Sequence, residues 1–341
     1  MTRVVIVDDS VVVCELLSYI LGAAADVEVV GAFNRGQDAI EALDRLRPDL
    51  VTMDINMPGM NGFEVTRRIM ESNPLPIVIV SGSWDCNEVA TTFRALEAGA
   101  LAVVARPPGI GHQEHHHAAQ QLVQTVQAMS GVRVVRRWPV AAARPLEEAV
   151  GVSSQKIDLV AIGASTGGPV VIQALLKSLP PKFAVPVIIV QHMAAGFIQG
   201  FAEWLGESCN RPVLVGGNHV RLVSAHAYIA PDGHQMGVDA QGRMTLSSGP
   251  PINGFAPSVG HLFRSVAESY GPRSAGVLLT GMGRDGAAEL KLMRDAGAVT
   301  FAQDRESSII HGMPGEAIRL GAAQYVLPPE KIAAALAAVS K

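Results

Sequence analysis

The chain has 341 residues, of which 48% are hydrophobic and 17% charged, so it is too apolar for a disordered protein and long enough for two folded domains. Its 27 basic and 31 acidic residues give a net charge of −4, which argues against strong binding to nucleic acid or to an anionic membrane surface. The three cysteines lack paired spacing and no apolar run is long enough to span a bilayer, so we expect a cytoplasmic protein with reduced thiols and no membrane insertion.

Residues 1–129 alternate short runs of β-branched residues with segments of helical periodicity. The first run begins at the N-terminus and meets two aspartates, which does not fit a signal peptide. Strands are predicted at Val4–Val7, Val27–Phe33, Leu50–Met53, Ile77–Val80 and Leu101–Ala105. Helices are predicted at Val11–Leu21, Ala39–Leu46, Phe63–Glu71, Val89–Ala98 and His116–Met129. This alternation predicts a parallel sheet with helices on both faces.

Polar residues stand at the carboxyl ends of these predicted strands. Asp8 and Asp9 follow the first strand, Asp54 follows the third, Ser81 the fourth and Arg106 the fifth. Ligands of open parallel sheets bind at these strand ends, so we expect the five side chains to line one crevice. Converging carboxylates repel one another unless a hard cation such as Mg²⁺ joins them. The pattern therefore predicts an acidic pocket that binds a cation.

Residues 130–155 mix charge with proline and serine and show weak periodicity. They predict a linker with one short helix at Leu146–Val150. The alternation of strands and helices returns in residues 156–341. Its predicted elements are strand Leu159–Ile162, helix Val170–Leu179, strand Val185–Val190, helix Gly196–Cys209, helix His261–Tyr270, strand Ala275–Thr280, helix Gly286–Ala296, strand Ala298–Gln303 and helix Lys331–Val339.

Between Ala227 and Ser248 the pattern changes to three short runs separated by turn residues. The runs begin at Tyr228, His234 and Met244, and they predict an antiparallel meander. The predicted fold class is therefore α/β with two doubly wound parallel-sheet domains. The first is flavodoxin-like, and the second is Rossmann-like with an antiparallel hairpin insertion.

The turn around Ser165 carries the strongest chemical signal in the chain. An apolar strand ends at Gly163, and Gly163-Ala-Ser165-Thr-Gly167 matches the nucleophile-elbow pattern, in which a serine hydroxyl stands at a sharp strand-to-helix turn. Backbone N–H groups that follow such a serine suit an oxyanion hole. Taken alone, the same motif also fits a plain glycine turn or a phosphate-binding loop.

A serine nucleophile needs a base, and the base needs an acid that orients it. His192 follows one predicted strand and Asp285 follows another, so both could converge with Ser165 at one sheet edge. The chain order Ser, His, Asp differs from that of α/β-hydrolases. His311 and Asp304 are rival occupants of the same two roles, and spacing does not decide between the pairs.

The first half of the chain, about Arg3 to Met129, resembles response-regulator receiver domains. The resemblance rests on Asp8-Asp9-Ser, Met53-Asp54-Ile-Asn56-Met-Pro58-Gly-Met-Asn-Gly62, Ser81 and Ala105-Arg106-Pro107. It implies phosphorylation at Asp54 by a CheA-type histidine kinase. It also implies Mg²⁺ held by Asp9, Asp54 and the backbone carbonyl of Asn56, with Asp8 assisting. Receivers normally carry lysine where this chain has Arg106, and often an aromatic residue where it has Val103.

The second half, from about Asp158, resembles the catalytic domain of the CheB family of chemotaxis methylesterases. The matching motifs are Gly163-Ala-Ser165-Thr-Gly-Gly-Pro169, Gln191-His192-Met193, Ala230-Pro231-Asp232-Gly233-His234, Leu279-Thr-Gly-Met282-Gly-Arg-Asp285-Gly286-Ala and Gly312-Met313-Pro314. The resemblance implies that Ser165 is the nucleophile, His192 the general base and acid, and Asp285 the residue that orients His192. Backbone N–H groups near Thr166 and Met282 would form the oxyanion hole, and hydrolysis would need no cofactor.

The function implied by both resemblances is hydrolysis of glutamate methyl esters on chemoreceptors, regulated by phosphorylation. Deamidation of receptor glutamines would use the same site, in chemotaxis or a related signalling pathway. The residues alone leave two other classes open. One is a nucleotide-binding module built on the turn Gly163–Gly168. However, no acidic residue follows at the distance needed to hydrogen-bond a ribose hydroxyl. The other is a non-enzymatic phosphoswitch that binds receptors.

Overall fold

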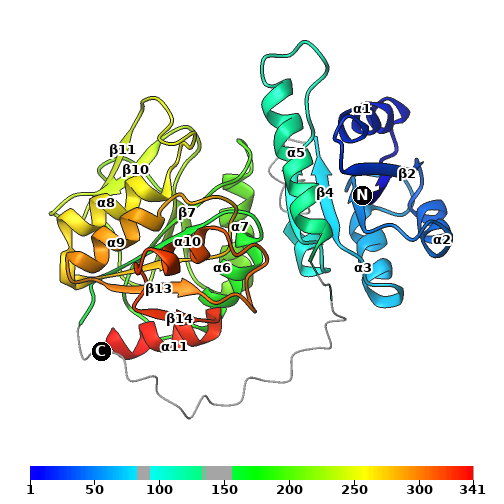
Figure 1. The fold of residues 1–341 in the computed structure, drawn as a ribbon. Helices are drawn as coiled ribbons and strands as arrows, with labels where there is room; N and C mark the ends of the chain where they lie inside the picture. The colour runs from blue at the N-terminus through cyan, green and yellow to red at the C-terminus, as the bar shows by residue number, and fades with distance from the viewer. Residues whose placement is uncertain (83–92, 133, 135–155, 341) are drawn as a thin grey trace. The chain divides into compact units, whose positions relative to one another are not determined.

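A computed structural model describes residues 1–82, 93–132, 134 and 156–340, which form two compact units (Figure 1). Each unit has its own sheet and its own core. The predicted short helix at Leu146–Val150 lies outside the described residues. Cys14 and Cys209 are free thiols, and Cys86 is also outside the described residues.

The first unit contains a five-stranded sheet in the order β2-β1-β3-β4-β5, and all neighbouring strands are parallel. Its strands are β1 (Thr2–Val7), β2 (Val27–Phe33), β3 (Leu50–Met53), β4 (Ile77–Ser81) and β5 (Ala102–Ala105). The strand order reverses between β1 and β3, which is the switch point where sheets of this order bind ligands. Asp8 and Asp54 follow these two strands and so lie on either side of the switch point.

Helices cover this sheet in two pairs, with α1 packed beside α5 and α2 beside α3. They are α1 (Val11–Gly22), α2 (Gly36–Leu46), α3 (Gly62–Ser72) and α5 (His115–Ser130). Two of them begin at side-chain caps, which satisfy backbone donors that a helix start leaves free. Ser10 Oγ accepts from Val13 N, and Asn61 Oδ1 accepts from Glu64 N. Within the predicted helix Val89–Ala98, residues 93–97 are helical and residues 89–92 are not described.

The second unit contains a seven-stranded sheet in the order β14-β13-β12-β6-β7-β9-β8, again with every neighbouring pair parallel. Its strands are β6 (Leu159–Ala164), β7 (Val187–Gln191), β8 (Val213–Val215), β9 (Ala227–Ile229), β12 (Ser274–Leu278), β13 (Val299–Gln303) and β14 (Tyr325–Leu327). The chain winds from β6 to β7 in one direction and later returns to β12 on the other side of β6. The switch point therefore lies between β6 and β12.

Six α-helices and one short 3₁₀ helix of the second unit are described (Figure 1). They are α6 (Gly168–Ser178), α7 (Ile198–Cys209), α8 (Val259–Ser269), η1 (Gly271–Arg273), α9 (Ala287–Asp295), α10 (Met313–Arg319) and α11 (Pro329–Val339). One face of the sheet packs against α8 and α9 in a core that includes Ile188, Leu262 and Leu290. Of the helices in the described ranges, none has the length and apolar character needed to cross a membrane.

The predicted antiparallel meander is wrong in one of its three strands. Residues 235–238 and 244–247 do form an antiparallel pair, β10 (Gln235–Val238) with β11 (Met244–Ser247). The first predicted strand is instead β9, which pairs in parallel with β7 and β8. The run is buried along its whole length, and Tyr228 is 1% exposed, as expected for a strand covered on both faces. The predicted α/β class with two parallel sheets and an antiparallel hairpin is confirmed.

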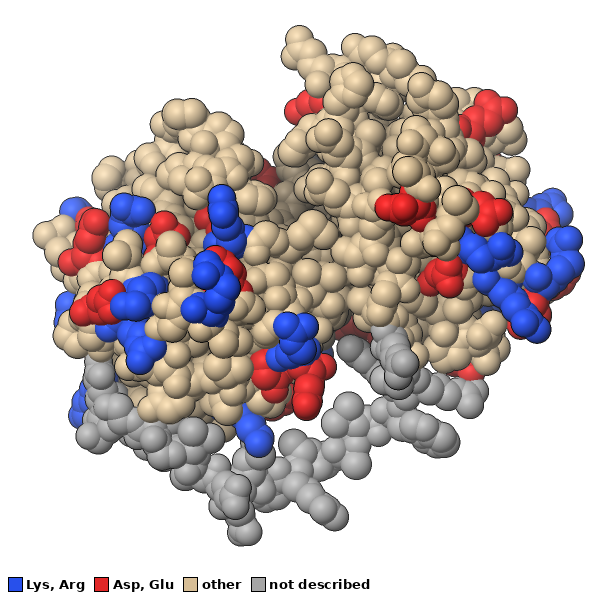
Figure 2. Space-filling model, viewed as in Figure 1, with Lys and Arg blue, Asp and Glu red and all other residues tan. Residues whose placement is uncertain are grey.

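Basic and acidic side chains are interspersed on the face of the molecule shown in Figure 2. Both signs occur over each of the two units on this face, which fits the small net charge of −4. The expectation that the protein does not bind nucleic acid stays a prediction.

Candidate functional site

The three residues predicted to act on the substrate follow three neighbouring strands of the second sheet. Ser165 follows β6, His192 follows β7, and Asp285 lies in the loop after β12. Because β6 stands between β12 and β7, parallel pairing brings these distant parts of the chain to one sheet edge. Ser165 itself lies at the switch point of the sheet, where open α/β folds bind ligands.

Hydrogen bonds from both neighbouring strands fix the turn that carries Ser165. Its N–H donates to the carbonyl of Thr280 at 3.0 Å, and its carbonyl accepts from Gly168 N at 2.8 Å and from the Gln191 side chain at 2.7 Å. Gly167 has a φ of 77°, a left-handed conformation that glycine adopts without strain. The hydroxyl of Ser165 makes no hydrogen bond with any described residue, and Ser165 is half-buried.

His192 lies between a carboxylate and an aromatic ring. Its Nε2 is 3.0 Å from Oδ2 of Asp285, and the two side chains are only 8% and 2% exposed. The ring of Phe255 stacks on the imidazole with centroids 3.9 Å apart and an interplanar angle of 3°. The hydrogen bond and the stack together restrict how far the imidazole can rotate or tilt.

The carboxylate of Asp285 sits at the N-terminus of α8, where backbone N–H groups favour negative charge. Its oxygens accept from Val259 N at 2.7 Å, Ser258 Oγ at 2.9 Å and Gly260 N at 3.2 Å. Burial by itself raises the pKa of Asp285. The hydrogen bond and charge of His192, together with the bonds from Val259 and Ser258, outweigh burial and hold the pKa below its usual range.

An ionised Asp285 can only accept a hydrogen bond, so Nε2 of His192 must carry the proton in this pair. The other ring nitrogen, Nδ1, then presents a lone pair. It is buried and has no hydrogen-bond partner among the described residues. Nδ1 is therefore the nitrogen of His192 that is available as a base.

The predicted oxyanion donors lie in two segments that contact each other. A Cβ added to Gly281 would lie 2.8 Å from Cβ of Ser165, so the segment before Met282 packs directly against the serine. Thr280 Oγ1 donates to the carbonyl of Thr166 at 3.0 Å and ties the same two segments together. Within the described ranges, the backbone N–H groups of Thr166 and Met282 make no hydrogen bond. Both remain candidate donors to an oxyanion.

The rival pair, His311 and Asp304, is not joined by a hydrogen bond in the described part of the chain. Nδ1 of His311 is 3.3 Å from Ser308 Oγ, whereas Oδ1 of Asp304 accepts from the backbone N–H of Ser307 at 3.0 Å. The structure thus brings His192 together with Asp285 and leaves the rival residues with separate partners.

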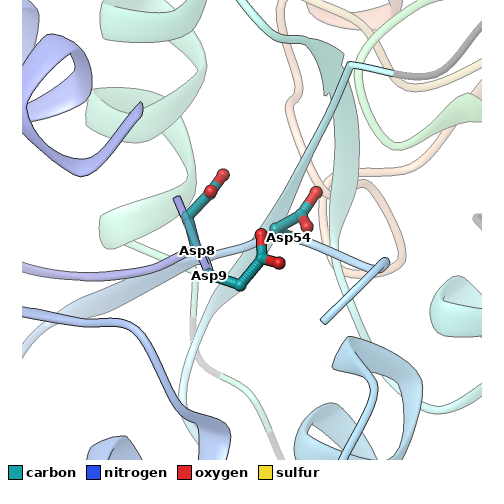
Figure 3. Close-up of side chains that lie close together, drawn as sticks. All are labelled: Asp8, Asp9 and Asp54. Carbon is teal, nitrogen blue, oxygen red and sulfur yellow. The ribbon is translucent and has the colours of Figure 1, made fainter. Parts of the chain in front are cut away.

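The acidic residues predicted to share a pocket in the first unit do so. Oxygens of Asp8, Asp9 and Asp54 lie within 4.8 Å of one another, and Figure 3 shows the three side chains gathered at the strand ends. Nη2 of Arg106 is 3.2 Å from Asp8 Oδ2 and 3.0 Å from Asp54 Oδ1. Ser81 is buried at the end of β4.

Burial raises the pKa of Asp8 to about 6, against the opposing effects of the Ser10 N–H and of Arg106. Burial likewise raises the pKa of Asp54, where Arg106 opposes the shift and Asp9 adds to it. Such crowded carboxylates favour a hard cation that would neutralise them. The three acids therefore fit Mg²⁺. Asn56 is exposed beside them, and its N–H donates to Asp54 Oδ2 at 3.2 Å.

Comparisons with known proteins show the families to which the two halves of the chain are similar. A sequence model of the CheB methylesterase family matches residues 160–336, and one of the response regulator receiver domain matches residues 4–118. The chain belongs to the CheB methylesterase family. Both resemblances drawn from the sequence are thereby confirmed. The predicted domain limits of 1–129, 130–155 and 156–341 stay predictions.

Two relatives of this CheB-family chain match it over almost its full length. Protein-glutamate methylesterase/protein-glutamine glutaminase 1 of Syntrophus aciditrophicus is 52% identical over 98% of this chain and 97% of its own. Protein-glutamate methylesterase/protein-glutamine glutaminase 4 of Geobacter metallireducens is also 52% identical, over 100% of this chain and 99% of its own. The crystal structure of the Thermotoga maritima CheB methylesterase catalytic domain is 34% identical. It covers 53% of this chain and 98% of its own, with a TM-score of 0.52.

These matches confirm that the protein is an enzyme of the predicted class, a carboxylic ester hydrolase of the methylesterase type. A non-enzymatic phosphoswitch and a nucleotide-binding module are set aside, because the whole chain matches enzymes of this one family.

Several residues besides the predicted ones support the site. Gln191 was only part of a motif, yet its Nε2 donates to the carbonyls of both Ser165 and His192. Ser258 and Phe255 hold Asp285 and His192 from the loop before α8. A serine before an apolar, helix-period run signals a helix N-cap, so Ser258 could have been found. Nothing in the sequence marks Phe255.

Proposed function

We propose that this enzyme hydrolyses methyl esters of glutamate side chains on methyl-accepting chemoreceptors and deamidates receptor glutamines. The catalytic residues would be Ser165, His192 and Asp285. The observation that carries the proposal is the hydrogen bond between His192 Nε2 and the buried Asp285 carboxylate, beside the strand that ends at Ser165. The names of the two relatives support the choice of glutamyl ester and glutaminyl amide as substrates.

Attack on the ester would begin with a proton transfer. His192 Nδ1 takes the hydroxyl proton of Ser165 while Oγ forms a bond to the carbonyl carbon. Such hydrogen bonds are often absent in a free enzyme and form only when substrate binds. The carbonyl oxygen becomes an oxyanion that accepts from the N–H groups of Thr166 and Met282. Each donor of this kind typically contributes about 2.7–4 kcal/mol of transition-state stabilisation.

The tetrahedral intermediate collapses when the imidazolium returns its proton to the leaving group. The bond between the carbonyl carbon and the methoxy oxygen breaks, and methanol departs, so the glutamyl group is left esterified to Ser165. Water then attacks this ester while His192 Nδ1 takes one of its protons. The bond between the carbonyl carbon and Oγ breaks, and the imidazolium returns the proton to Oγ, which frees glutamate and restores the serine. A glutamine substrate follows the same path with ammonia as the leaving group. No cofactor is needed in either case.

Regulation would act through the receiver pocket. The carboxylate of Asp54 attacks a phosphoryl group carried by the histidine of a CheA-type kinase, and the bond from phosphorus to nitrogen breaks. Mg²⁺ held by Asp9, Asp54 and the carbonyl of Asn56 would neutralise charge on the transferred phosphoryl group. Phosphorylation replaces the single charge of the carboxylate with a phosphoryl group that carries about two negative charges and three acceptor oxygens. We propose that the unphosphorylated receiver domain restricts access to the esterase site.

The proposed setting is the cytoplasm, where chemoreceptors present their methylated helices and the kinase acts. A chemotaxis pathway or a related signalling pathway would use the enzyme to reset receptor methylation.

Release of methanol from membranes that carry methyl-labelled chemoreceptors tests the proposed reaction. Ser165→Ala should lower the rate by about 10³-fold or more, because the nucleophile is lost. Ser178→Ala is the matched control: Ser178 is an exposed serine on α6 whose hydroxyl, among the described residues, bonds only to the carbonyl of Ala174. It should leave the rate unchanged. Methanol release by Ser165→Ala at the unmodified rate would contradict the proposal.

A further inference from the structure

The positive charge of the receiver pocket is the guanidinium of Arg106, and two carboxylates hold it in place. One terminal nitrogen of Arg106, Nη2, donates both to Asp8 Oδ2 at 3.2 Å and to Asp54 Oδ1 at 3.0 Å. The two carboxylates are buried, with Asp8 1% and Asp54 4% exposed. A guanidinium joined to two buried anions is not free to swing into solvent, because leaving would uncover both charges.

The rest of the guanidinium is less well satisfied. Nε of Arg106 is buried and has no hydrogen-bond partner among the residues that the structure describes. Because Nε has no partner among these residues, hydrogen bonding at Nε does not set the position of this group. An unpaired buried donor costs about 1–3 kcal/mol. The two ion pairs and the atoms packed around the head must set it instead.

Gly82 is the neighbour that leaves room for the head. The backbone N–H of Arg106 donates to the carbonyl of Ser81 at 2.8 Å, which holds the end of β5 beside the end of β4. A Cβ added to Gly82 would lie 3.0 Å from Cζ and Nη1 of Arg106 and 3.1 Å from Nε. These separations are shorter than the optimal contact of about 3.5–4.0 Å between carbon atoms. The three atoms belong to the charged head and not to the aliphatic stem.

A side chain at position 82 would therefore displace the guanidinium. A free arginine could move aside at little cost, but a shift of this one by a few tenths of an ångström strains its contacts with Asp8 and Asp54. Lysine differs because its ammonium is compact and lacks the planar fork of arginine. With lysine at position 106, the space beside residue 82 would hold no planar group for a Cβ to meet.

We propose that Gly82 is a positioning residue for phosphorylation of Asp54, because its missing side chain allows the head of Arg106 to reach both carboxylates. Positions 82 and 106 then form a matched pair, in which arginine at 106 requires glycine at 82 and lysine does not. This inference rests on the proposed phosphorylation of Asp54.

The test compares four full-length proteins: the unchanged chain, Gly82→Ala, Arg106→Lys and the double variant. The readout is the initial rate of phosphorylation by acetyl phosphate in the presence of Mg²⁺. Alanine at 82 should slow phosphorylation at least about fivefold when residue 106 is arginine, and less than about twofold when it is lysine. Gly131→Ala is the matched control, since a Cβ there meets nothing within 4 Å. It should not change the rate.

Two results would overturn the matched pair. Equal slowing by alanine in both backgrounds would show that residue 82 acts independently of the guanidinium. If Gly82→Ala does not slow phosphorylation when residue 106 is arginine, the guanidinium can accommodate a side chain at position 82. Asp54→Ala in the same assay separates this inference from the proposed function. If Asp54→Ala is phosphorylated at the unchanged rate, both the proposed phosphorylation of Asp54 and the matched pair are overturned. If phosphorylation depends on Asp54 but alanine at 82 slows it equally with arginine and with lysine at 106, only the matched pair is overturned.

Discussion

Two contacts of His192 act on different features of its imidazole. The hydrogen bond from Nε2 to Asp285 decides which nitrogen carries the proton. The parallel ring of Phe255, 3.9 Å away, limits the tilt of the imidazole plane. The first contact concerns the protonation of the proposed base, and the second concerns its orientation.

Replacing Phe255 with leucine tests the second contact. Phe255→Leu should lower kcat for ester hydrolysis about threefold to tenfold, because the stacking that orients the base is lost. The effect is expected in kcat, because the stack orients the base that acts in the chemical step. Phe255→Tyr keeps the ring and serves as the control. Equal kcat values for the leucine variant and the unchanged enzyme would show that the stack does not position His192.

The raised pKa of Asp8 predicts a stability change with pH. An acid whose folded-state pKa is raised to about 6 holds its proton more tightly in the folded state than in the unfolded state, where its pKa is near 3.8. The stabilisation is present below the unfolded pKa and is lost as pH rises through about 6. Between pH 5 and pH 7, Asp8→Asn should therefore gain about 1 kcal/mol of stability relative to the unchanged chain.

Urea denaturation in metal-free buffer at both pH values measures this difference. The comparison between the two proteins cancels titrations that they share. A constant difference between pH 5 and pH 7 would mean that Asp8 is already ionised at the lower pH.

Some residues of the candidate sites can be predicted from the sequence, and others cannot. Ser165, His192, Asp285 and Asp54 each follow an apolar run, so the rule that ligands bind at strand ends was enough. The rival His311 could not be excluded in that way, because it too belongs to a loop after a strand of the same sheet. Only the hydrogen-bond partners distinguish the two histidines: His192 bonds to Asp285, whereas His311 lies beside Ser308.

At the level of elements, the proposed esterase site depends on how closely α8 approaches β6. A Cβ added to Gly163 would lie 2.2 Å from Cγ1 of Val259, the first residue of α8. The same helix start donates to the carboxylate of Asp285. A glycine at the end of β6 therefore permits the contact that brings Asp285 toward the strand of Ser165.

Gly163→Ala should destabilise the second unit by about 1–3 kcal/mol, because the added methyl group overpacks the contact between β6 and α8. Urea denaturation of the full-length chain measures the loss. Gly249→Ala is the matched control, since a Cβ at Gly249 meets nothing within 4 Å. Equal stability of Gly163→Ala and the control would show that α8 can move away without cost.

Long, periodic elements were predictable, and very short ones were not. The ends of α1, α3 and α9 lie within two residues of their predicted limits, because helices of this length show their period clearly. The ends of β6 lie equally close, because a continuous apolar run marks this buried strand. The strands β8 and β14 have only three residues each and show no period. The sequence predicts β9 as part of a meander, because nearby turn residues are typical of antiparallel hairpins and do not reveal which sheet a strand joins.

At the level of the whole molecule, the proposal couples a phosphorylated carboxylate to a hydrolytic site in another unit. A coupling free energy of about 1–3 kcal/mol corresponds to a change in activity of about fivefold to 150-fold. Adding acetyl phosphate and Mg²⁺ should therefore raise methanol release by the unchanged chain at least about fivefold.

Asp54→Ala should abolish this stimulation, because the acceptor carboxylate is missing. Asp38→Ala, which removes an exposed aspartate in the first turn of α2, should respond like the unchanged chain. Methanol release measured with and without the phosphodonor compares the three proteins. Stimulation of Asp54→Ala to the full extent would place the phosphoacceptor elsewhere.

Labelling with a fluorophosphonate, followed by mass spectrometry of the digested protein, tests most directly whether Ser165 is an activated nucleophile. The account predicts a single adduct on the peptide that contains Ser165, formed much more slowly in His192→Gln. An adduct on another serine with Ser165 unmodified, or equally fast labelling in His192→Gln, would contradict it.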